Sequence, residues 1–189
     1  MDPHPPKAIL FDLDDTILEY DVSADGAWHS IASEFADRID GFEMERFTVA
    51  LREFREWYWG DPERHRRGRL DLKLSRREVV RGTFAVMDLP KKPAGSILDE
   101  FADTYTVKRE NAVKPFAGAI ETLSWVRGQG IRTALVTNGT SEMQRGKVDR
   151  FGLARYFDYI LIEGEFGAGK PEEQVYRHAL NQLGTAPSE

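Results

Sequence analysis

Three carboxylates follow a short apolar segment near the N-terminus. The run from residue 7 to residue 13 is apolar and nearly continuous, as in a buried parallel strand, and Asp12, Asp14 and Asp15 fall at its end. Open α/β sheets bind their ligands at that end of their strands. Because closely spaced carboxylates repel one another, they need a cation, and oxygen ligands alone favour Mg²⁺. Asp12 and Asp14 are therefore a predicted metal site. The alternative to a metal site is a purely structural one, in which the carboxylates cap a helix. We expect the Asp15 side chain to face away from the other two.

Two later apolar runs also end in polar residues: residues 131–136 before Thr137, Asn138 and Gly139, and residues 159–162 before the segment 167–171 with Lys170. If the three runs are strands of one parallel sheet, Asp12, Thr137 and Lys170 should converge on a single pocket. The alternative for Thr137 is a structural role as a strand residue before a glycine turn. The alternative for Lys170 is that of a solvated lysine at the start of a helix. A cation is unfavourable at a helix N-terminus, which favours a functional role for Lys170.

The three motifs, in this order, resemble those of the haloacid dehalogenase superfamily. They are Asp-x-Asp-x-Thr at 12–16, strand-Thr-Asn-Gly at 137–139 and Gly-x-x-Lys-Pro at 167–171, and they cover the front three-quarters of that family's core. With Gln144 and Lys147 between them, they look like the helical-cap branch that contains nucleotidases and N-acylneuraminate phosphatases. The resemblance implies an α/β fold with a Rossmann-like parallel sheet, incomplete at its C-terminus, and an inserted all-helical cap domain.

The predicted domains are an α/β core of residues 1–19 and 110–189 and a helical cap of residues 20–109. Apolar residues at helical spacing predict four cap helices, around residues 28–39, 44–58, 80–87 and 97–105. Ser75 is the predicted cap of the third helix. In the core, we expect a helix from Pro171 to Leu183, with the proline in its first turn and Gly184 at its end.

The resemblance also implies a reaction, the Mg²⁺-dependent hydrolysis of a phosphomonoester through an aspartyl-phosphate. Asp12 would be the nucleophile, and Asp14 would be general acid to the leaving alkoxide and then general base for water. Thr137 would donate its hydroxyl to a phosphoryl oxygen, beside N–H groups of the turn at 138–139, and Lys170 would compensate the charge. An aspartate at position 14 favours phosphoryl transfer over dehalogenation, because a halide leaving group needs no proton. Phosphoryl mutase activity shares the aspartyl-phosphate and is the alternative reaction.

A dense basic run, residues 63–69, stands out in the predicted cap of an otherwise acidic chain. A solvated loop is one interpretation. In the other, Arg67 and Arg69 attract a second anionic group of the substrate toward the active site.

The composition is that of an ordinary globular protein, with 189 residues, 41% hydrophobic residues and 31% charged residues. The net charge of −6 argues against general nucleic-acid binding, so the predicted partner is a small phosphorylated metabolite. There is no apolar run long enough for a membrane span, and the N-terminus lacks the pattern of a signal peptide. With no cysteine to form disulfides or bind zinc, we expect a cytoplasmic protein.

A fourth motif is expected after the last helix, as a buried strand ending in acidic residues that complete the Mg²⁺ site. The sequence ends at Glu189, where that strand would begin. Glu163 and Glu165 are poor substitutes, because they would approach from the far side of the sheet. Weaker Mg²⁺ binding and self-association through an open sheet edge are the expected consequences. The alternatives to an active phosphatase are therefore a catalytically impaired fragment and a phosphate-binding or regulatory protein that needs a partner chain.

Overall fold

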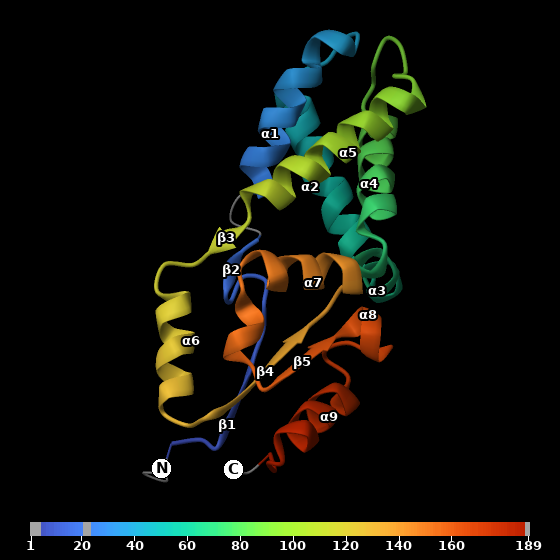
Figure 1. Cartoon of the computed structure of the whole chain (residues 1–189). Helices are drawn as coiled ribbons and strands as arrows, with labels where there is room; N and C mark the ends of the chain where they lie inside the picture. The colour runs from blue at the N-terminus through green and yellow to red at the C-terminus, as the bar shows by residue number, and fades with distance from the viewer. Residues whose placement is uncertain (1–4, 21–23, 188–189) are drawn as a thin grey trace. The chain divides into compact units, whose positions relative to one another are not determined.

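The computed structural model describes residues 5–20 and 24–187, and it divides into two compact units (Figure 1). One unit comprises Met1–Asp21 and Lys114–Glu189, and the other comprises Val22–Val113. Each unit has its own hydrophobic core. The predicted cap began at residue 20, and its residues 21–23 lie outside the described ranges.

Three parallel strands form the main sheet of the first unit, in the order β1 (Ala8–Phe11), β4 (Arg132–Thr137), β5 (Tyr159–Ile162). The predicted α/β fold with a parallel sheet is confirmed. Strand β4 is central and almost entirely buried. Strand β1 is only partly buried, because within the described residues it has a neighbour on one side only. The expectation of a buried first strand over residues 7–13 is therefore wrong in both its burial and its length.

The helices of this unit are α6 (Ala119–Gly128), α7 (Ser141–Arg150) and α9 (Glu173–Leu183), with a single turn, α8 (Glu163–Phe166), directly after β5. The apolar side of α9 packs against the sheet, and Gly184 ends the helix in a left-handed conformation, as predicted. A 3₁₀ turn, Leu153–Tyr156, follows α7. The prediction that Pro171 lies in the first turn of α9 is wrong. The N-cap is Glu172, and a cis peptide bond joins Lys170 to Pro171 ahead of it.

A short antiparallel ribbon that the sequence analysis did not predict joins β2 (Leu18–Glu19) to β3 (Lys114–Pro115). The Lys114 ammonium lies 3.2 Å from the Glu19 carboxylate across this ribbon. Because the two strands flank residues 22–113, the chain leaves the first unit and returns to it through one paired element.

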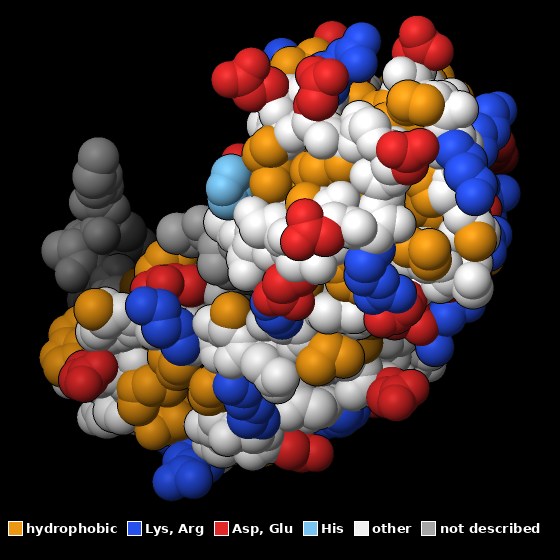
Figure 2. Space-filling model, turned by 90° about the horizontal axis from the view of Figure 1, so that it is seen from above, with side chains coloured by type: hydrophobic (Ala, Val, Ile, Leu, Met, Phe, Trp, Pro, Cys, Tyr) orange, Lys and Arg blue, Asp and Glu red, His pale blue; other side chains and the backbone are white. Residues whose placement is uncertain are grey.

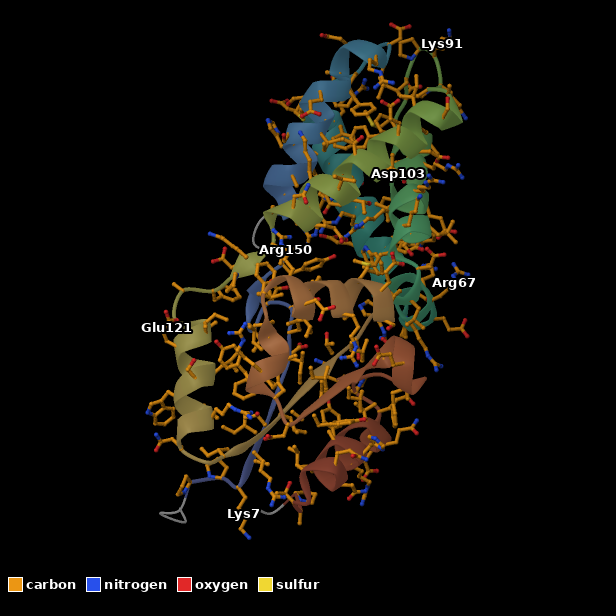
Figure 3. All side chains as sticks on the ribbon, in the orientation of Figure 1. Lys7, Arg67, Lys91, Asp103, Glu121 and Arg150 are labelled. Atoms are coloured by element: carbon orange, nitrogen blue, oxygen red, sulfur yellow. The ribbon has the colours of Figure 1, made fainter. Side chains whose placement is uncertain are left out.

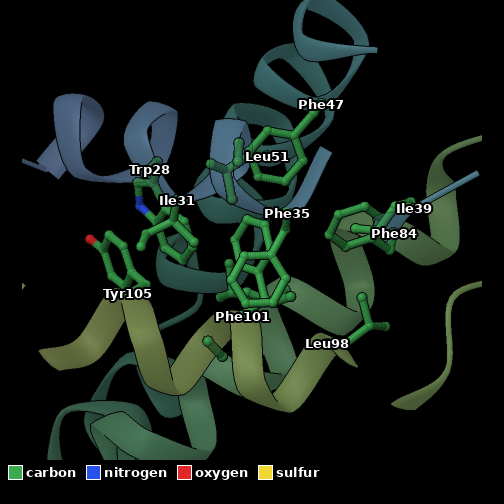
Figure 4. Close-up of a cluster of buried hydrophobic side chains, with 14 of the residues drawn as sticks. Trp28, Ile31, Phe35, Ile39, Phe47, Leu51, Phe84, Leu98, Phe101 and Tyr105 are labelled. Carbon is green, nitrogen blue, oxygen red and sulfur yellow. The ribbon is translucent and has the colours of Figure 1, made fainter. Parts of the chain in front are cut away.

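The second unit contains five α-helices within its described residues: α1 (Ala24–Phe35), α2 (Met44–Gly60), α3 (Pro62–Leu70), α4 (Leu72–Val86) and α5 (Gly95–Ala112). A 3₁₀ turn, Ala36–Arg38, follows α1. Aromatic side chains from four of these helices fill the core (Figure 4). Trp28 stacks on Tyr105 with ring centroids 3.5 Å apart, and Phe101 contacts Phe35 at 5.0 Å and Phe47 at 5.6 Å. The aromatic residues at helical spacing are thus core residues.

The basic segment 63–69 forms most of α3, and the interpretation of this segment as a loop is wrong. The Asp61 carboxylate accepts a hydrogen bond from Arg64 N at 2.8 Å, and Pro62 occupies the first helical position. Both features start a helix without any apolar periodicity. The prediction for Ser75 is also wrong. Asp71 caps α4, whereas Ser75 is buried inside the helix and donates to Gly68 O.

The face of the molecule in Figure 2 carries acidic and basic side chains that are interspersed. Among the described helices, none has the length and apolar character that a membrane crossing requires.

Candidate active site

Asp12 is the first residue after β1, at the carboxyl end of the strand (Figure 1). Its Oδ1 accepts a hydrogen bond from Leu13 N at 2.7 Å and lies 2.6 Å from the Lys170 ammonium. Its Oδ2 has no partner among the described residues, and 42% of the side chain is exposed. The arrangement leaves one carboxylate oxygen of Asp12 available for attack while a lysine compensates the charge on the other.

Lys170 is held in place by the side chain of Asn138. The amide of Asn138 accepts a hydrogen bond from Lys170 N at 2.7 Å and donates one to Lys170 O at 2.9 Å. The loops that follow β4 and β5 are therefore joined at the lysine. Because Lys170 precedes the N-cap of α9, it lies outside the helix, and the conflict with the helix dipole that we inferred from the sequence does not arise.

Thr137, the last residue of β4, is almost fully buried. Its Oγ1 accepts a hydrogen bond from Gln144 Nε2 at 2.6 Å, and its own proton makes a long bond of 3.4 Å to Asn138 O. A bond of that length is weak. The hydroxyl proton of Thr137 can therefore turn toward a phosphoryl oxygen at little cost.

Asp14 is held by two side chains of α7. Lys147 Nζ lies 2.8 Å from each Asp14 carboxylate oxygen, and Gln144 Nε2 lies 3.1 Å from one of them. The sequence analysis used Gln144 and Lys147 only as part of the family resemblance and missed them as site residues. The two residues are three positions apart on the helix after the second strand, so they lie on one helical face. This spacing could have identified them as site residues.

Asp15 is directed elsewhere. Its backbone adopts a left-handed conformation, with φ of +56°, and its Oδ1 accepts a hydrogen bond from Tyr20 N at 2.9 Å. The sequence argument assumed extended geometry at this position. A turn replaces it, closed by a bond of 2.7 Å from Asp15 N to Leu18 O.

Of the N–H groups predicted to bind phosphate, that of Gly139 is already engaged. It donates to the carboxylate of Glu163 at 3.1 Å, and Glu163 is 3% exposed. The N–H groups of Asp14 and Asn138, by contrast, have no acceptor within residues 5–20 and 24–187. These two follow the ends of adjacent strands, so they are the better donors for a phosphate.

Two glycines allow the loops around this site to approach closely. A Cβ atom on Gly169 would lie 2.5 Å from the carboxylate carbon of Glu163, and one on Gly164 would lie 2.7 Å from Ser141 N. Because the atom near Gly164 belongs to the backbone, that position requires glycine, whereas a larger residue at Gly169 would displace the Glu163 side chain.

The main-chain oxygen of Asp14 fits Mg²⁺, because it accepts no hydrogen bond from the described residues. The Asp12 carboxylate is the second predicted ligand. The Asp14 carboxylate fits less well, because the Lys147 ammonium beside it would repel the metal ion. Within the described ranges, no group of three or more His, Asp or Glu side chains is arranged to hold a metal. The assignment of Asp12 and Asp14 as metal ligands stays a prediction.

Arg67 and Arg69 lie on α3, in the second unit (Figure 3). Arg67 is 68% exposed and 4.0 Å from the Glu78 carboxylate. Arg69 Nη1 lies 3.4 Å from His65 Nδ1. Their predicted contact with substrate stays a prediction.

Glu165 and Arg145 form an ion pair that links α8 to α7. Arg145 donates to both Glu165 oxygens, at 2.8 and 2.6 Å, and Ser141 Oγ donates at 2.7 Å. The hydrogen bond from Arg145 holds the pKa of Glu165 below its ordinary value, against a smaller opposing effect of burial. The pair supports the loop after β5, and neither Glu165 nor Glu163 is placed as a metal ligand.

The family model for haloacid dehalogenase-like hydrolases matches residues 6–189. Phosphoserine phosphatase of Thermus thermophilus is 45% identical over 67 residues, which are 35% of this chain and 27% of that protein. Pyrimidine 5'-nucleotidase of Escherichia coli is 27% identical over 176 residues, covering 93% of this chain and 71% of that one. Glyceraldehyde 3-phosphate phosphatase of Methanopyrus kandleri is 27% identical over 186 residues, which cover 97% of this chain and 72% of that protein.

Solved structures show the same fold. A dehalogenase structure aligns with a TM-score of 0.59 at 22% identity, over 99% of this chain and 74% of that one. A candidate β-phosphoglucomutase from Thermotoga maritima aligns with a TM-score of 0.66 at 17% identity, over 97% and 73%.

The Glu165 ion pair generates a pH-dependent stability. Because its pKa is lower in the folded protein than the ordinary 4.5, the carboxylate stabilises the fold above that value and the contribution is lost as pH falls through the folded pKa. We expect Glu165→Gln to lower the urea midpoint at pH 7 and to reduce its fall between pH 7 and about pH 4. Glu142→Gln, an exposed neighbour, is the control. Parallel midpoint curves for Glu165→Gln and the unaltered protein would contradict the assignment.

Proposed function

The chain belongs to the haloacid dehalogenase-like hydrolase family, and we propose that it hydrolyses phosphomonoesters of small metabolites through an aspartyl-phosphate. The observation that carries this proposal is the state of Asp12, with Oδ1 beside Lys170 and Oδ2 free of partners among the described residues. The relatives named phosphatases and nucleotidase support the same class of reaction.

In the proposed first step, Asp12 Oδ2 attacks phosphorus and the bond from phosphorus to the ester oxygen breaks. Asp14 gives a proton to the departing oxygen, so that an alcohol leaves. Lys170 balances the negative charge on Asp12 and on the transferring group. The Thr137 hydroxyl and the Asn138 N–H bind phosphoryl oxygens as their charge changes.

In the proposed second step, a water molecule attacks the phosphorus of the aspartyl-phosphate. Asp14, now a carboxylate, takes the proton of this water, and the bond from phosphorus to Asp12 Oδ2 breaks. Inorganic phosphate leaves, and both aspartates return to their starting states. One aspartate thus forms the covalent bond and the other moves protons.

The proposed cofactor is Mg²⁺, held by the Asp12 carboxylate and the Asp14 main-chain oxygen. When bound, it supplies positive charge to the phosphate oxygens. The expected cellular site is the cytoplasm, and the proposed partner is a small molecule rather than a nucleic acid or a membrane. The open side of β1 is the proposed surface for self-association.

The substrate class follows from the relatives only in outline, since their names cover a phosphoamino acid, a pyrimidine nucleotide and a triose phosphate. All are small phosphomonoesters. We propose that Arg67 and Arg69 favour those that carry a second anionic group. A phosphomutase would transfer the phosphoryl group to a second hydroxyl instead of to water, and phosphate release distinguishes the two.

Asp12→Asn should abolish hydrolysis of 4-nitrophenyl phosphate and of the three named substrate types, because an amide cannot form the aspartyl-phosphate. We expect a loss of about 10³-fold or more in kcat, measured as phosphate release. Asp149→Asn, which removes an exposed carboxylate from α7, is the control and should retain activity. Equal activity of Asp12→Asn and the unaltered chain would refute the proposal. Phosphate binding without turnover in the unaltered chain would favour the binding-protein alternative.

Removal of divalent cations should stop turnover. We expect dialysis against EDTA to reduce phosphate release to background and excess Mg²⁺ to restore it, because the two oxygens bind hard cations. Ca²⁺ in place of Mg²⁺ is the comparison, since its longer bonds change the geometry. Full activity in EDTA would show that the reaction needs no metal.

Arg67→Ala combined with Arg69→Ala should raise KM for substrates with two anionic groups, such as 2-phosphoglycolate, and leave kcat within about twofold. The reason is that exposed cations attract the anionic substrate and so favour its binding, although dissolved salt screens this attraction. Lys91→Ala with Lys92→Ala removes two exposed cations from the same unit and is the matched control. Lys91 is labelled in Figure 3. Unchanged KM for every substrate turned over would contradict this role.

A further inference from the structure

Lys147 is a buried lysine that the reaction above does not use. Its residue is 8% exposed, and its ammonium lies 2.8 Å from both oxygens of Asp14. The ring of Tyr20 lies 4.0 Å from the ammonium on another side. Buried lysines are rare unless they are paired, and this one is paired with the residue expected to move protons.

Stability alone is a weak reason for this pair. Removing a carboxylate and an ammonium from water costs free energy that their attraction offsets only in part, and apolar residues of similar size are often at least as stable. Lys170 cannot replace Lys147 in this role, because it faces Asp12 from the loop before α9. Each of the two aspartates therefore has a lysine of its own, from a different element.

Gln144 adds a second restraint from the same face of α7. Its Nε2 lies 3.1 Å from one Asp14 oxygen and 2.6 Å from Thr137 Oγ1. The Asp14 carboxylate is thus fixed relative to the hydroxyl expected to bind phosphate. With Lys147 on both oxygens, the carboxylate has little freedom to rotate.

We propose that Lys147 is a positioning residue that holds Asp14 as an oriented carboxylate for the second half of the reaction, in which Asp14 takes the proton of the attacking water. The inference rests on the proposed phosphatase function and deepens it. Lys147 contacts neither phosphorus nor the leaving group in this role and acts through Asp14. Tyr20 packs on the ammonium and keeps it directed at the carboxylate.

A substrate with a very good leaving group separates the two halves of the reaction. 2,4-Dinitrophenolate leaves without a proton, so formation of the aspartyl-phosphate from its phosphate ester does not need Asp14 as an acid. Hydrolysis of the intermediate still needs Asp14 as a base. Rapid mixing of the full chain with Mg²⁺ and this ester measures both steps, as a burst of dinitrophenolate followed by steady release.

For Lys147→Met, we expect a burst at the rate of the unaltered chain, followed by steady release that is about 10- to 100-fold slower, the scale of a misplaced catalytic group. Lys147→Arg keeps the charge and should recover part of the steady rate. Tyr20→Leu should slow the steady rate by a smaller factor. Arg150→Met, which removes an exposed cation from the same helix, should change neither step.

The outcomes are distinct. If Lys147→Met slows the burst and the steady release equally, or slows neither, the inference is overturned. The phosphatase proposal stands in both cases. If Lys147→Met does not fold, as judged by circular dichroism, Lys147→Arg and Tyr20→Leu decide, and an unchanged steady rate in both overturns the inference. Absence of any release by the unaltered chain would refute the phosphatase proposal and, with it, this role for Lys147.

Discussion

Repulsion between Asp12 and Asp14 is the constraint on which the rest of this site depends. The two carboxylates leave the same short turn after β1, and each is paired with an ammonium at 2.6 to 2.8 Å. The two lysines come from separate elements, Lys170 from the loop before α9 and Lys147 from α7. The segments after β4 and after β5 therefore each supply one of the two cations that offset this repulsion.

Those segments are brought together by close contacts of the backbone. Asn138 holds Lys170 through two hydrogen bonds, and Glu163 accepts the N–H of Gly139. Gly169 leaves room for the buried carboxylate of Glu163 at the same point. These polar groups thus hold the loops together, and the groups left without partners among the described residues are the predicted ligand contacts.

The family, the hydrolase class and the parallel sheet could be predicted because their signals are local. A strand end followed by Asp12 or by Thr137 is visible in one stretch of sequence, and the comparisons confirm the family. The partners of Asp14 could not be predicted in the same way. Lys147 belongs to a helix rich in charged residues, and the ring that packs on its ammonium is that of Tyr20, which follows a two-residue strand.

Two other errors have different physical origins. The helix α3 has no apolar stripe, so periodicity missed it, although Asp61 and Pro62 were a start signal. The burial of β1 was overestimated because the number of neighbours of a strand is a property of the whole sheet. The roles assigned to Asp12, Asp14 and Lys170 stay predictions.

The central place of β4 has a consequence for how the chain folds. Strands β4 and β5 are close in sequence and can pair soon after both exist, whereas β1 is separated from β4 by the whole of the second unit. Closing the longer loop costs more entropy and comes later unless the intervening helices fold first and shorten it. Asp12 and Asp14 would then meet their lysines at the end of folding, so that partly folded chains carry two closely spaced carboxylates without their cations.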